Sequence, residues 1–270
     1  STRVCRLPCM AIGAFFDLDN TLVRGTSLVH VATAMYRRGY FSTRKMAHGL
    51  LLEAQFRIQG REDMNGANFV RQNFLDAIEG TPAADLEEIV RHVFESKLSD
   101  RIWPGVRELA DAHLAAGHEV WIMTASPIEV AEIIADRFGF TGAMGTLAER
   151  DDDGIYTGQM DNFLHGAQKA AAVEKLIAER GIDADASHAY SDSINDLGML
   201  ELVGNPHAVN PDAALREVAE LHSWPVHDYR SRAQWKNWVG MGAAASVVTA
   251  GYLARRASKA RKALAEQLPR

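Results

Sequence analysis

The chain has 270 residues, of which 47% are hydrophobic and 24% are charged. This balance is typical of a soluble globular protein and excludes fibrous and intrinsically disordered classes. The net charge of −6 is unevenly distributed, because residues 229–270 carry nine basic side chains and one acidic one, whereas the first 228 residues hold 20 basic and 34 acidic side chains. An acidic body excludes nucleic acid as the main partner, and a basic tail on it predicts a separate role for that tail.

The cysteine and histidine content excludes several classes of site. Two cysteines, Cys5 and Cys9, are too few for a disulfide framework, and no Cys or His spacing indicates zinc. The ten histidines are scattered, and we interpret them as surface or core residues. The first twenty residues contain no long apolar run after a basic start, so we expect no secretory signal and a cytoplasmic location.

The first predicted element is a strand over residues 11–16. These residues are apolar apart from one glycine, which favours a strand buried on both faces. From about residue 27 to residue 99, apolar residues recur at helical spacing, with glycines and one proline between the runs. This segment predicts a block of about four helices without a strand.

Strands and helices alternate after residue 103. We expect a helix that ends near Gly117, followed by a strand over residues 119–123. We interpret Ser126 as the cap of the next helix and Pro127 as a residue of its first turn.

The rest of the alternating region continues this pattern. Residues 144–160 predict a hairpin whose acidic turn, residues 151–154, is solvated. The later predicted elements are a helix over 167–180, a strand over 187–191, a helix over 193–203, and then a short strand, a helix and a short strand to about residue 226.

Strands that alternate with helices predict an α/β fold with a parallel sheet. The helical block is then an insertion after the first strand. The predicted domains are a core of residues 11–25 and 101–228, an inserted helical domain of residues 26–100 and a C-terminal tail of residues 229–270.

Polar residues gather in four short motifs, three directly after predicted strands and one at the start of a helix. Because ligands bind beyond the carboxyl ends of the strands in an open parallel sheet, we expect the motifs to converge there. The motifs are Asp17-Leu18-Asp19-Asn20-Thr21-Leu22, Thr124-Ala125-Ser126, Gly166-Ala167-Gln168-Lys169 and Ser191-Asp192-Ser193-Ile194-Asn195-Asp196.

The acidic residues of these motifs predict a cation site. Asp17, Asp192 and Asp196 would repel one another unless a cation offset their charge. The absence of clustered Cys or His leaves oxygen ligands, which suit Mg²⁺, and Mg²⁺ usually keeps positions for waters and a phosphate. Lys169 and the Thr124 hydroxyl would supply charge and hydrogen bonds to a phosphate. A carboxylate can attack phosphorus and form an aspartyl-phosphate.

Taken singly, each motif also has a structural interpretation. Carboxylates at these positions can end a strand or cap a helix, and Lys169 can lie on a solvated helix face. The occurrence of all four motifs in order favours a functional interpretation.

Together the motifs resemble the four signature motifs of the haloacid dehalogenase (HAD) superfamily of phosphohydrolases. The insert resembles the helical C1-type cap of that superfamily. Over residues 11–228 the pattern is most similar to the phosphoserine-phosphatase-like branch, subfamily IB. The resemblance implies a Rossmann-like HAD core with a parallel sheet, and an inserted helical cap that closes over the site and selects the substrate.

The resemblance also implies residue roles. Asp17 would be the nucleophile, and Asp19 would be the general acid for the leaving group and then the base for water. The Asp17 carboxylate, the Asp19 backbone carbonyl and Asp192 would hold Mg²⁺. The other implied roles are phosphate binding by Thr124 with the following amide, stabilisation of the transferring phosphoryl group by Lys169, a position close to the phosphate for Asn195, and orientation of Lys169 or of the metal's waters by Asp196.

We therefore predict a Mg²⁺-dependent phosphomonoester hydrolase for a small-molecule phosphate. Phosphoserine phosphatases carry a glutamate nine positions after the nucleophile, where this chain has Thr26, and commonly a serine where it has Asn20. We therefore do not expect phosphoserine as the substrate. Two alternatives stay open, a phosphoryl transferase or mutase on the same fold and a catalytically inactive, membrane-tethered binding protein. No pattern predicts an oligomeric state.

The tail combines an uncharged segment with basic flanks. Residues 238–254 carry no charge, and Trp235, Trp238 and Tyr252 lie near the two ends of this segment. This pattern is typical of a membrane interface, although the segment is at the short limit for a span. The tail predicts either membrane contact through residues 235–262 or a helix that packs on the body or on a partner subunit.

Overall fold

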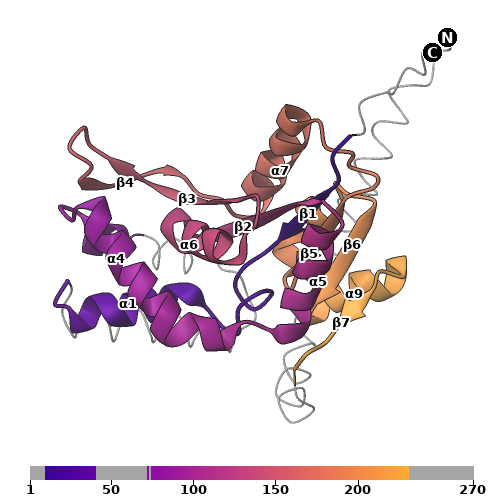
Figure 1. The fold of residues 1–270 in the computed structure, drawn as a ribbon, viewed down its shortest axis with the longest axis horizontal. Coiled ribbons are helices and arrows are strands. Elements are labelled where there is room, and N and C mark those ends of the chain that lie inside the picture. The colour runs from indigo at the N-terminus through magenta and orange to yellow at the C-terminus, as the bar shows by residue number, and fades with distance from the viewer. Residues whose placement is uncertain (1–9, 41–71, 73, 231–270) are drawn as a thin grey trace, which may run out of the picture.

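A seven-stranded sheet forms the centre of the computed structural model, which describes residues 10–40, 72 and 74–230 (Figure 1). The strand order is β4-β3-β2-β1-β5-β6-β7, and all neighbours are parallel except β3 and β4. This arrangement confirms the predicted α/β fold with a mostly parallel sheet. The strands are β1 (Gly13–Phe16), β2 (Glu119–Pro127), β3 (Gly142–Arg150), β4 (Tyr156–Asn162), β5 (His188–Ser191), β6 (Asn205–Val209) and β7 (Val226–His227).

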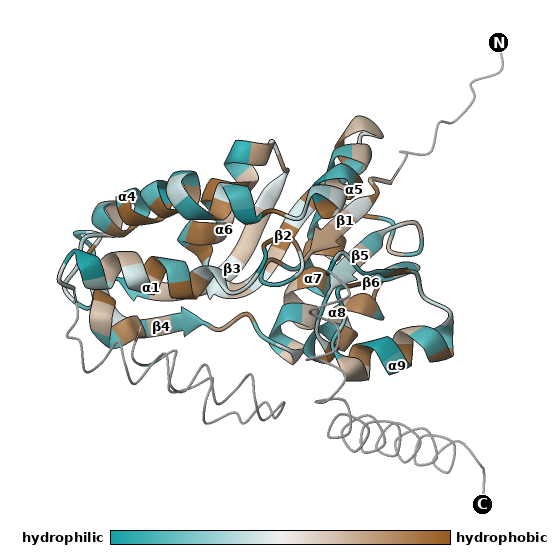
Figure 2. Cartoon of the chain, turned by 90° about the horizontal axis from the view of Figure 1, so that it is seen from below, coloured by the Kyte–Doolittle hydropathy of each residue, from teal (hydrophilic) through white to brown (hydrophobic). Residues whose placement is uncertain are grey.

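Helices pack on both faces of the sheet, which explains why the central strand is apolar throughout. Ala14 and Phe16 of β1 share a core with α1, α4, α5 and α6, whereas Phe15 points into a second core with α7, α8 and α9. Figure 2 shows hydrophilic and hydrophobic residues alternating along these helices, as expected of helices with one buried face. The helices are α1 (Ser27–Arg37), α4 (Ala83–Val93), α5 (Pro104–Ala115), α6 (Ile128–Phe138), α7 (Ala167–Arg180), α8 (Leu197–Leu200) and α9 (Ala213–His222).

The helices α1 and α4 lie between β1 and β2 in the chain, within the predicted insertion. A π-helical turn (Phe94–Leu98) and a 3₁₀ turn (Ser99–Arg101) follow α4. The two segments that connect this insertion to the sheet pair with each other, because Val23 bridges Ile102 and the Arg24 amide donates to the Arg101 carbonyl over 2.7 Å. The insertion therefore leaves and rejoins the sheet at one point. The predicted helices between residues 41 and 71 lie outside the described residues.

The predicted hairpin is formed by β3 and β4, and its tip contacts the inserted helices. The Asp151 carboxylate accepts the amides of Asp153 and Ile155 and so closes the turn. The Gly80 amide donates to the Tyr156 carbonyl over 2.8 Å, just before α4 begins. Figures 1 and 2 both place α1, α4 and β4 at one end of the molecule.

Two predicted helix starts are corrected by the structure. Strand β2 continues through Pro127, and Pro127 rather than Ser126 is the N-cap of α6, with no side-chain cap bond. The interpretation of Ser126 as a helix cap was therefore wrong, because its hydroxyl is engaged elsewhere. The helix predicted over 193–203 begins as a 3₁₀ turn, Ile194–Asp196, before α8, because the Ser193 hydroxyl caps that turn.

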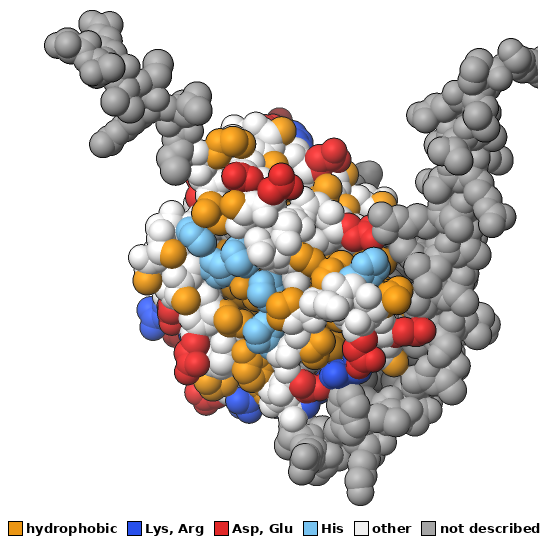
Figure 3. Space-filling model, turned by 90° about the vertical axis from the view of Figure 1, so that its right-hand side faces the viewer, with side chains coloured by type: hydrophobic (Ala, Val, Ile, Leu, Met, Phe, Trp, Pro, Cys, Tyr) orange, Lys and Arg blue, Asp and Glu red, His pale blue; other side chains and the backbone are white. Residues whose placement is uncertain are grey.

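Five of the histidines that are far apart in the sequence lie together. We call them the histidine cluster: His113, His118, His188, His207 and His227. They come from α5, the loop before β2, and strands β5, β6 and β7. Figure 3 shows histidine side chains gathered in a band on the face of the molecule that it draws. The sequence reading missed this cluster, because it formed no spacing along the chain.

The first residues of the predicted tail pack on the core. The Tyr229 amide donates to Asn210 Oδ1 over 2.8 Å, and a Cβ added at Gly105 would come within 2.2 Å of the Tyr229 ring. Within the described ranges, no helix is both long and apolar enough to cross a membrane. The predicted membrane-contact segment, residues 235–262, lies outside these ranges.

Candidate active site

The first motif lies where β1 ends, in the middle of the sheet. β1 is flanked by β2 and β5, which carry the second and fourth motifs at their own carboxyl ends. Pairing with β5 continues one residue beyond β1, because the Asp17 amide donates to the Tyr190 carbonyl over 2.9 Å. The parallel sheet therefore gathers three of the predicted motifs at one edge, as the sequence predicted.

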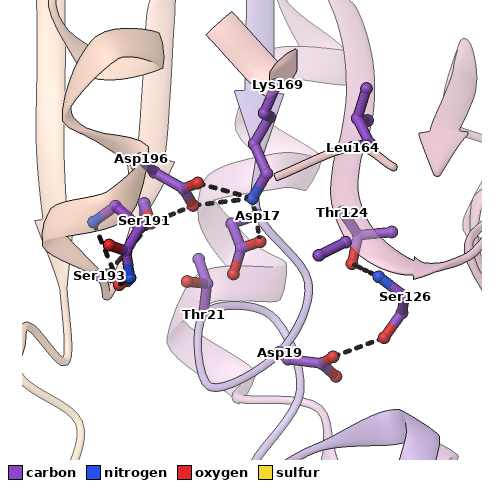
Figure 4. A network of polar contacts seen from close by, with 12 residues as sticks. Asp17, Asp19, Thr21, Thr124, Ser126, Leu164, Lys169, Ser191, Ser193 and Asp196 are labelled. Carbon is purple, nitrogen blue, oxygen red and sulfur yellow. Dashed lines mark hydrogen bonds and ion pairs between the residues drawn. The ribbon is translucent and has the colours of Figure 1, made fainter. Parts of the chain in front are cut away.

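The third motif joins them through Lys169, in the first turn of α7. Lys169 Nζ lies 2.8 Å from Asp17 Oδ1 and 2.8 Å from Asp196 Oδ2, and the Ser191 hydroxyl donates to Asp196 Oδ2 over 2.7 Å (Figure 4). Asp17, Lys169 and Asp196 are 7%, 2% and 3% exposed. Charges this deeply buried need partners, because isolated ions are strongly disfavoured away from water.

The pKa shifts of Asp17 and Lys169 show how the negative and positive charges of this buried cluster balance. Burial and the charge of Asp196 outweigh the lowering effect of Lys169 and raise the pKa of Asp17 to about 7. Burial also works against a charged Lys169, but Asp17 and Asp196 outweigh burial and raise the pKa of the ammonium. The cluster thus holds more negative charge than Lys169 alone offsets.

Asp192 adds a further carboxylate next to Asp17. Burial, followed by the charges of Asp17, Asp212 and Asp196, raises the pKa of Asp192 well above its ordinary value. The Thr21 hydroxyl donates to Asp192 Oδ1 over 3.1 Å and orients it.

Asp212, which the sequence reading did not single out, holds the loop that carries Asp192. The Asp212 amide donates to the Asp192 carbonyl, and the Asp212 carboxylate accepts the amides of Ile194 and Leu215. The only sequence signal for it was its position as a cap of α9.

Asp19 points away from Asp17 and toward the end of β2 (Figure 4). The Ser27 amide donates to Asp19 Oδ1 over 2.6 Å, and the Ser126 hydroxyl donates to Asp19 Oδ2 over 2.7 Å. Ser27 is the first residue of α1. The Asp19 carboxylate therefore connects the inserted helices to the sheet.

The two remaining predicted residues lie at the same edge. Thr124 Oγ1 accepts the Ser126 amide over 3.0 Å, which leaves the hydroxyl proton of Thr124 for another acceptor. The Asn195 side-chain amide donates to Ser193 Oγ over 2.9 Å, within its own motif.

The donor set suits a hard cation held by few protein ligands. In the described part of the chain, no three His, Cys, Asp or Glu side chains are arranged to hold a metal ion. The carboxylates of Asp17 and Asp192, which interact electrostatically, and the backbone carbonyl of Asp19 would all offer oxygen atoms. Such a set fits Mg²⁺, which prefers one or two carboxylates with waters and phosphate in its other positions.

The Asn20 backbone gives a local reason for one departure noted in the sequence. Asn20 has a φ of 62°, a left-handed conformation that asparagine tolerates better than most residues. Its carbonyl accepts the Asn210 side chain over 3.3 Å. The asparagine is therefore explained by the turn after Asp19.

Comparisons with known proteins identify the family of this chain. A model of the haloacid dehalogenase-like hydrolases matches residues 14–201. Phosphoserine phosphatase SerB1 of Mycobacterium tuberculosis is 43% identical over 222 residues, which cover 82% of this chain and 72% of that protein. Histidinol-phosphatase of Neisseria meningitidis serogroup C is 30% identical over 227 residues, which cover 80% of this chain and 98% of that protein.

A solved structure supports the same fold. The crystal structure of a protein of unknown function from Bordetella pertussis is similar with a TM-score of 0.69 and 26% sequence identity. The similarity covers 81% of this chain and 99% of that one.

Proposed function

This chain belongs to the haloacid dehalogenase-like hydrolase family and is a phosphatase of its phosphoserine-phosphatase-like branch, and we propose that it is a Mg²⁺-dependent phosphomonoester hydrolase that works through an aspartyl-phosphate on Asp17. The observation that carries this proposal is the buried contact of Lys169 with Asp17 and Asp196, beside Asp192. A carboxylate at a strand end, with a fixed ammonium against it, suits attack on a phosphoryl group.

In the first proposed step, an Asp17 oxygen attacks phosphorus and the ester P–O bond breaks. Asp19, as a carboxylic acid, gives its proton to the leaving alkoxide. In the second step, Asp19 takes a proton from water, the resulting hydroxide attacks the aspartyl-phosphate, and inorganic phosphate leaves Asp17. Lys169 stabilises the phosphoryl charge in both steps.

The remaining residues bind and orient. We propose that Thr124 donates its hydroxyl proton to a phosphoryl oxygen, that Asp196 holds Lys169 in place, and that Asn195 lies close to the phosphate. Asp17, Asp192 and the Asp19 carbonyl would hold Mg²⁺, which supplies positive charge to the phosphoryl oxygens. We further propose that the helices of residues 26–100 act as a cap that excludes water and selects the substrate.

The first experiment compares Asp17→Asn with Asp161→Asn. Asp161 is an exposed carboxylate on β4, so its variant controls for loss of charge. We expect Asp17→Asn to lose release of inorganic phosphate from p-nitrophenyl phosphate by at least about 10³-fold, and Asp161→Asn to keep it. Activity retained in Asp17→Asn would refute the nucleophile assignment.

We propose that the substrate is a small phosphomonoester other than phosphoserine. Relatives named for two different substrates show that the family name does not select one. Thr26, the N-cap of α1, brings no charge to meet the ammonium of phosphoserine, so we propose a different substrate. A panel of small phosphomonoesters that includes phosphoserine and histidinol phosphate tests this point.

A matched pair of variants tests the role of position 26. We expect Thr26→Glu to raise kcat/KM for phosphoserine by about 10-fold, whereas Thr26→Gln, of similar size but neutral, leaves it unchanged. An equal response of the two variants would contradict the charge argument. Equal amounts of alcohol and inorganic phosphate among the products would separate hydrolysis from phosphoryl transfer.

A further inference from the structure

We propose that Ser126 is a positioning residue for proton transfer, because its hydroxyl holds the carboxylate of Asp19. The inference rests on the proposed function, in which Asp19 is the general acid and base. It assigns to Ser126 a role that helix capping does not explain, because α6 has no side-chain cap bond.

The contacts leave the Asp19 carboxylate little freedom to rotate. Oδ2 accepts the Ser126 hydroxyl over 2.7 Å and Oδ1 accepts the Ser27 amide over 2.6 Å. Ser126 and Ser27 are 5% and 0% exposed. Both carboxylate oxygens are therefore held by buried donors, one at the end of β2 and one at the start of α1.

A hydroxyl suits a group that changes its protonation state. Asp19 must carry a proton before the leaving group departs and must lack it before water is activated. A serine hydroxyl can donate to a carboxylate and can accept from a carboxylic acid, whereas a backbone amide can only donate. Ser126 can thus hold Oδ2 in both states, while the Ser27 amide holds Oδ1.

A second hydroxyl makes this reversal possible without moving heavy atoms. Ser27 Oγ lies 3.0 Å from Ser126 Oγ, and either atom can be the donor. When Ser126 donates to Asp19, Ser27 can donate to Ser126, and when Asp19 is protonated the direction can reverse.

The backbone around Ser126 fixes its side chain. Its amide donates to Thr124 Oγ1 over 3.0 Å, and Pro127 follows it at the end of β2. A group held on a rigid strand end positions its partner more accurately than a group on a mobile loop.

The test uses two substrates of similar size that differ in leaving group. p-Nitrophenyl phosphate expels a weakly basic phenolate, whereas phenyl phosphate expels a more basic one that needs a proton from Asp19. We expect Ser126→Ala to lower kcat/KM for phenyl phosphate by about 10-fold and for p-nitrophenyl phosphate by less than about 3-fold. Asp19→Asn sets the upper limit of this difference between the substrates.

Two further comparisons isolate the hydroxyl. Ser126→Thr keeps the hydroxyl, so it should retain the wild-type ratio of the two kcat/KM values. Ser126→Val replaces the hydroxyl by a methyl group of similar size, so it should show the selective loss of kcat/KM for phenyl phosphate. Ser27→Ala keeps the amide that binds Asp19 and removes only the second hydroxyl, so we expect a loss of about 2-fold on phenyl phosphate.

The outcomes distinguish this inference from the function on which it rests. Equal losses on both substrates in Ser126→Val, with a melting temperature like that of Ser126→Thr, would overturn the positioning role and leave the hydrolase proposal standing. Activity retained in Asp17→Asn would overturn the hydrolase proposal itself, whatever the Ser126 variants do.

Discussion

The carboxylates around Lys169 and the histidine cluster are two polar groups of side chains that meet on β5. Ser191 contacts the first group through Asp196, and Asp192 directly after β5 belongs to it, while His188 belongs to the second group and Tyr190 contacts it through His113. In the first group, buried opposite charges contact each other. In the second group, burial disfavours the charged form of four of the five imidazoles. Adjacent residues of one strand thus show two ways of burying polar side chains.

The histidine cluster is held by hydrogen bonds between its rings and to the Tyr190 hydroxyl. His113 contacts the Tyr190 hydroxyl over 2.9 Å and His118 over 2.8 Å, and His207 bridges His188 and His227 over 3.2 Å on each side. The two ring nitrogens of His207 face different partners, so the nitrogens of these three histidines do not converge on one point as metal ligands would.

Burial disfavours the charged form of four of these histidines. It acts with the charges of neighbouring histidines to lower the pKa of both His113 and His207 to about 4. It also lowers the pKa of His188 and of His227. Burial raises the pKa of a carboxyl and lowers that of an imidazole, so the two groups respond to acid in opposite directions.

The largest effect is expected when the ammonium of Lys169 is removed from among the carboxylates. Lys169→Met leaves the carboxylates of Asp17 and Asp196 buried without their counter-ion, so we expect a loss of about 3–5 kcal/mol in the free energy of unfolding and of about 10²- to 10³-fold in kcat. Chemical denaturation at pH 7 and phosphate release measure the two losses. Lys175→Met, on the exposed side of the same helix, is the control. A Lys169 variant as stable as this control would contradict the charge-pair description.

We expect acidification to destabilise the protein through the histidine cluster. The folded-state pKa of His113 and of His207 lies below the ordinary value, so the unfolded chain binds more protons between about pH 6.5 and pH 4, and stability falls as the pH falls through that window. After discounting for partial exposure, we expect His113 and His207 together to contribute a loss of roughly 2 kcal/mol from pH 7 to pH 5. His207→Gln should reduce that loss by about 1 kcal/mol.

Denaturation at a series of pH values without divalent cations tests this sign. The groups that face His207 are His188, His227 and Tyr190, and those that face His113 are His118, His188 and Tyr190. The raised pKa values of Asp17 and Asp192 act in the opposite direction, because those carboxyls bind protons more readily when folded. An unchanged pH profile in His207→Gln would show that the histidine cluster does not determine acid sensitivity.

We expect Mg²⁺ to bind at the carboxylates around Lys169 and not at the histidine cluster. Free Mg²⁺ at ten times its dissociation constant should add about 1.4 kcal/mol to the free energy of unfolding. Asp192→Asn should lose this gain and His207→Gln should retain it, as measured by thermal melting without substrate. The opposite ranking of the two variants would place the ion elsewhere.

The smallest effect is expected from a change at Tyr190, which tests whether the two groups are independent. Tyr190→Phe removes the hydroxyl that contacts His113 but keeps the backbone carbonyl that binds the Asp17 amide, so we expect a loss of about 1 kcal/mol in stability and less than a 2-fold change in kcat. Its effect should add to that of Asp196→Asn within about 0.5 kcal/mol. Strong coupling between these variants would show that the two groups act as one.

Local sequence signals predicted the strand before Asp17 and the helix that carries Lys169. The apolar run before Asp17 indicated a buried strand, and the helix predicted over residues 167–180 is α7. Motifs at strand ends must converge in a parallel sheet, so the proximity of Asp17, Lys169 and Asp196 followed from the order of the elements alone. These features depend on periodicity and on topology, which a chain carries in its own sequence.

Tertiary structure decided the features that depend on contacts between distant segments. Ser126 resembled a helix cap because serine before proline commonly is one, and only folding placed Asp19, just after the neighbouring strand β1, within reach of its hydroxyl. The histidines came together because α5 and three strands placed them on one face, and Asp212 joined the site through the loop after β5. A hydrogen bond between residues a hundred positions apart leaves no local pattern, because its geometry exists only after the chain has folded.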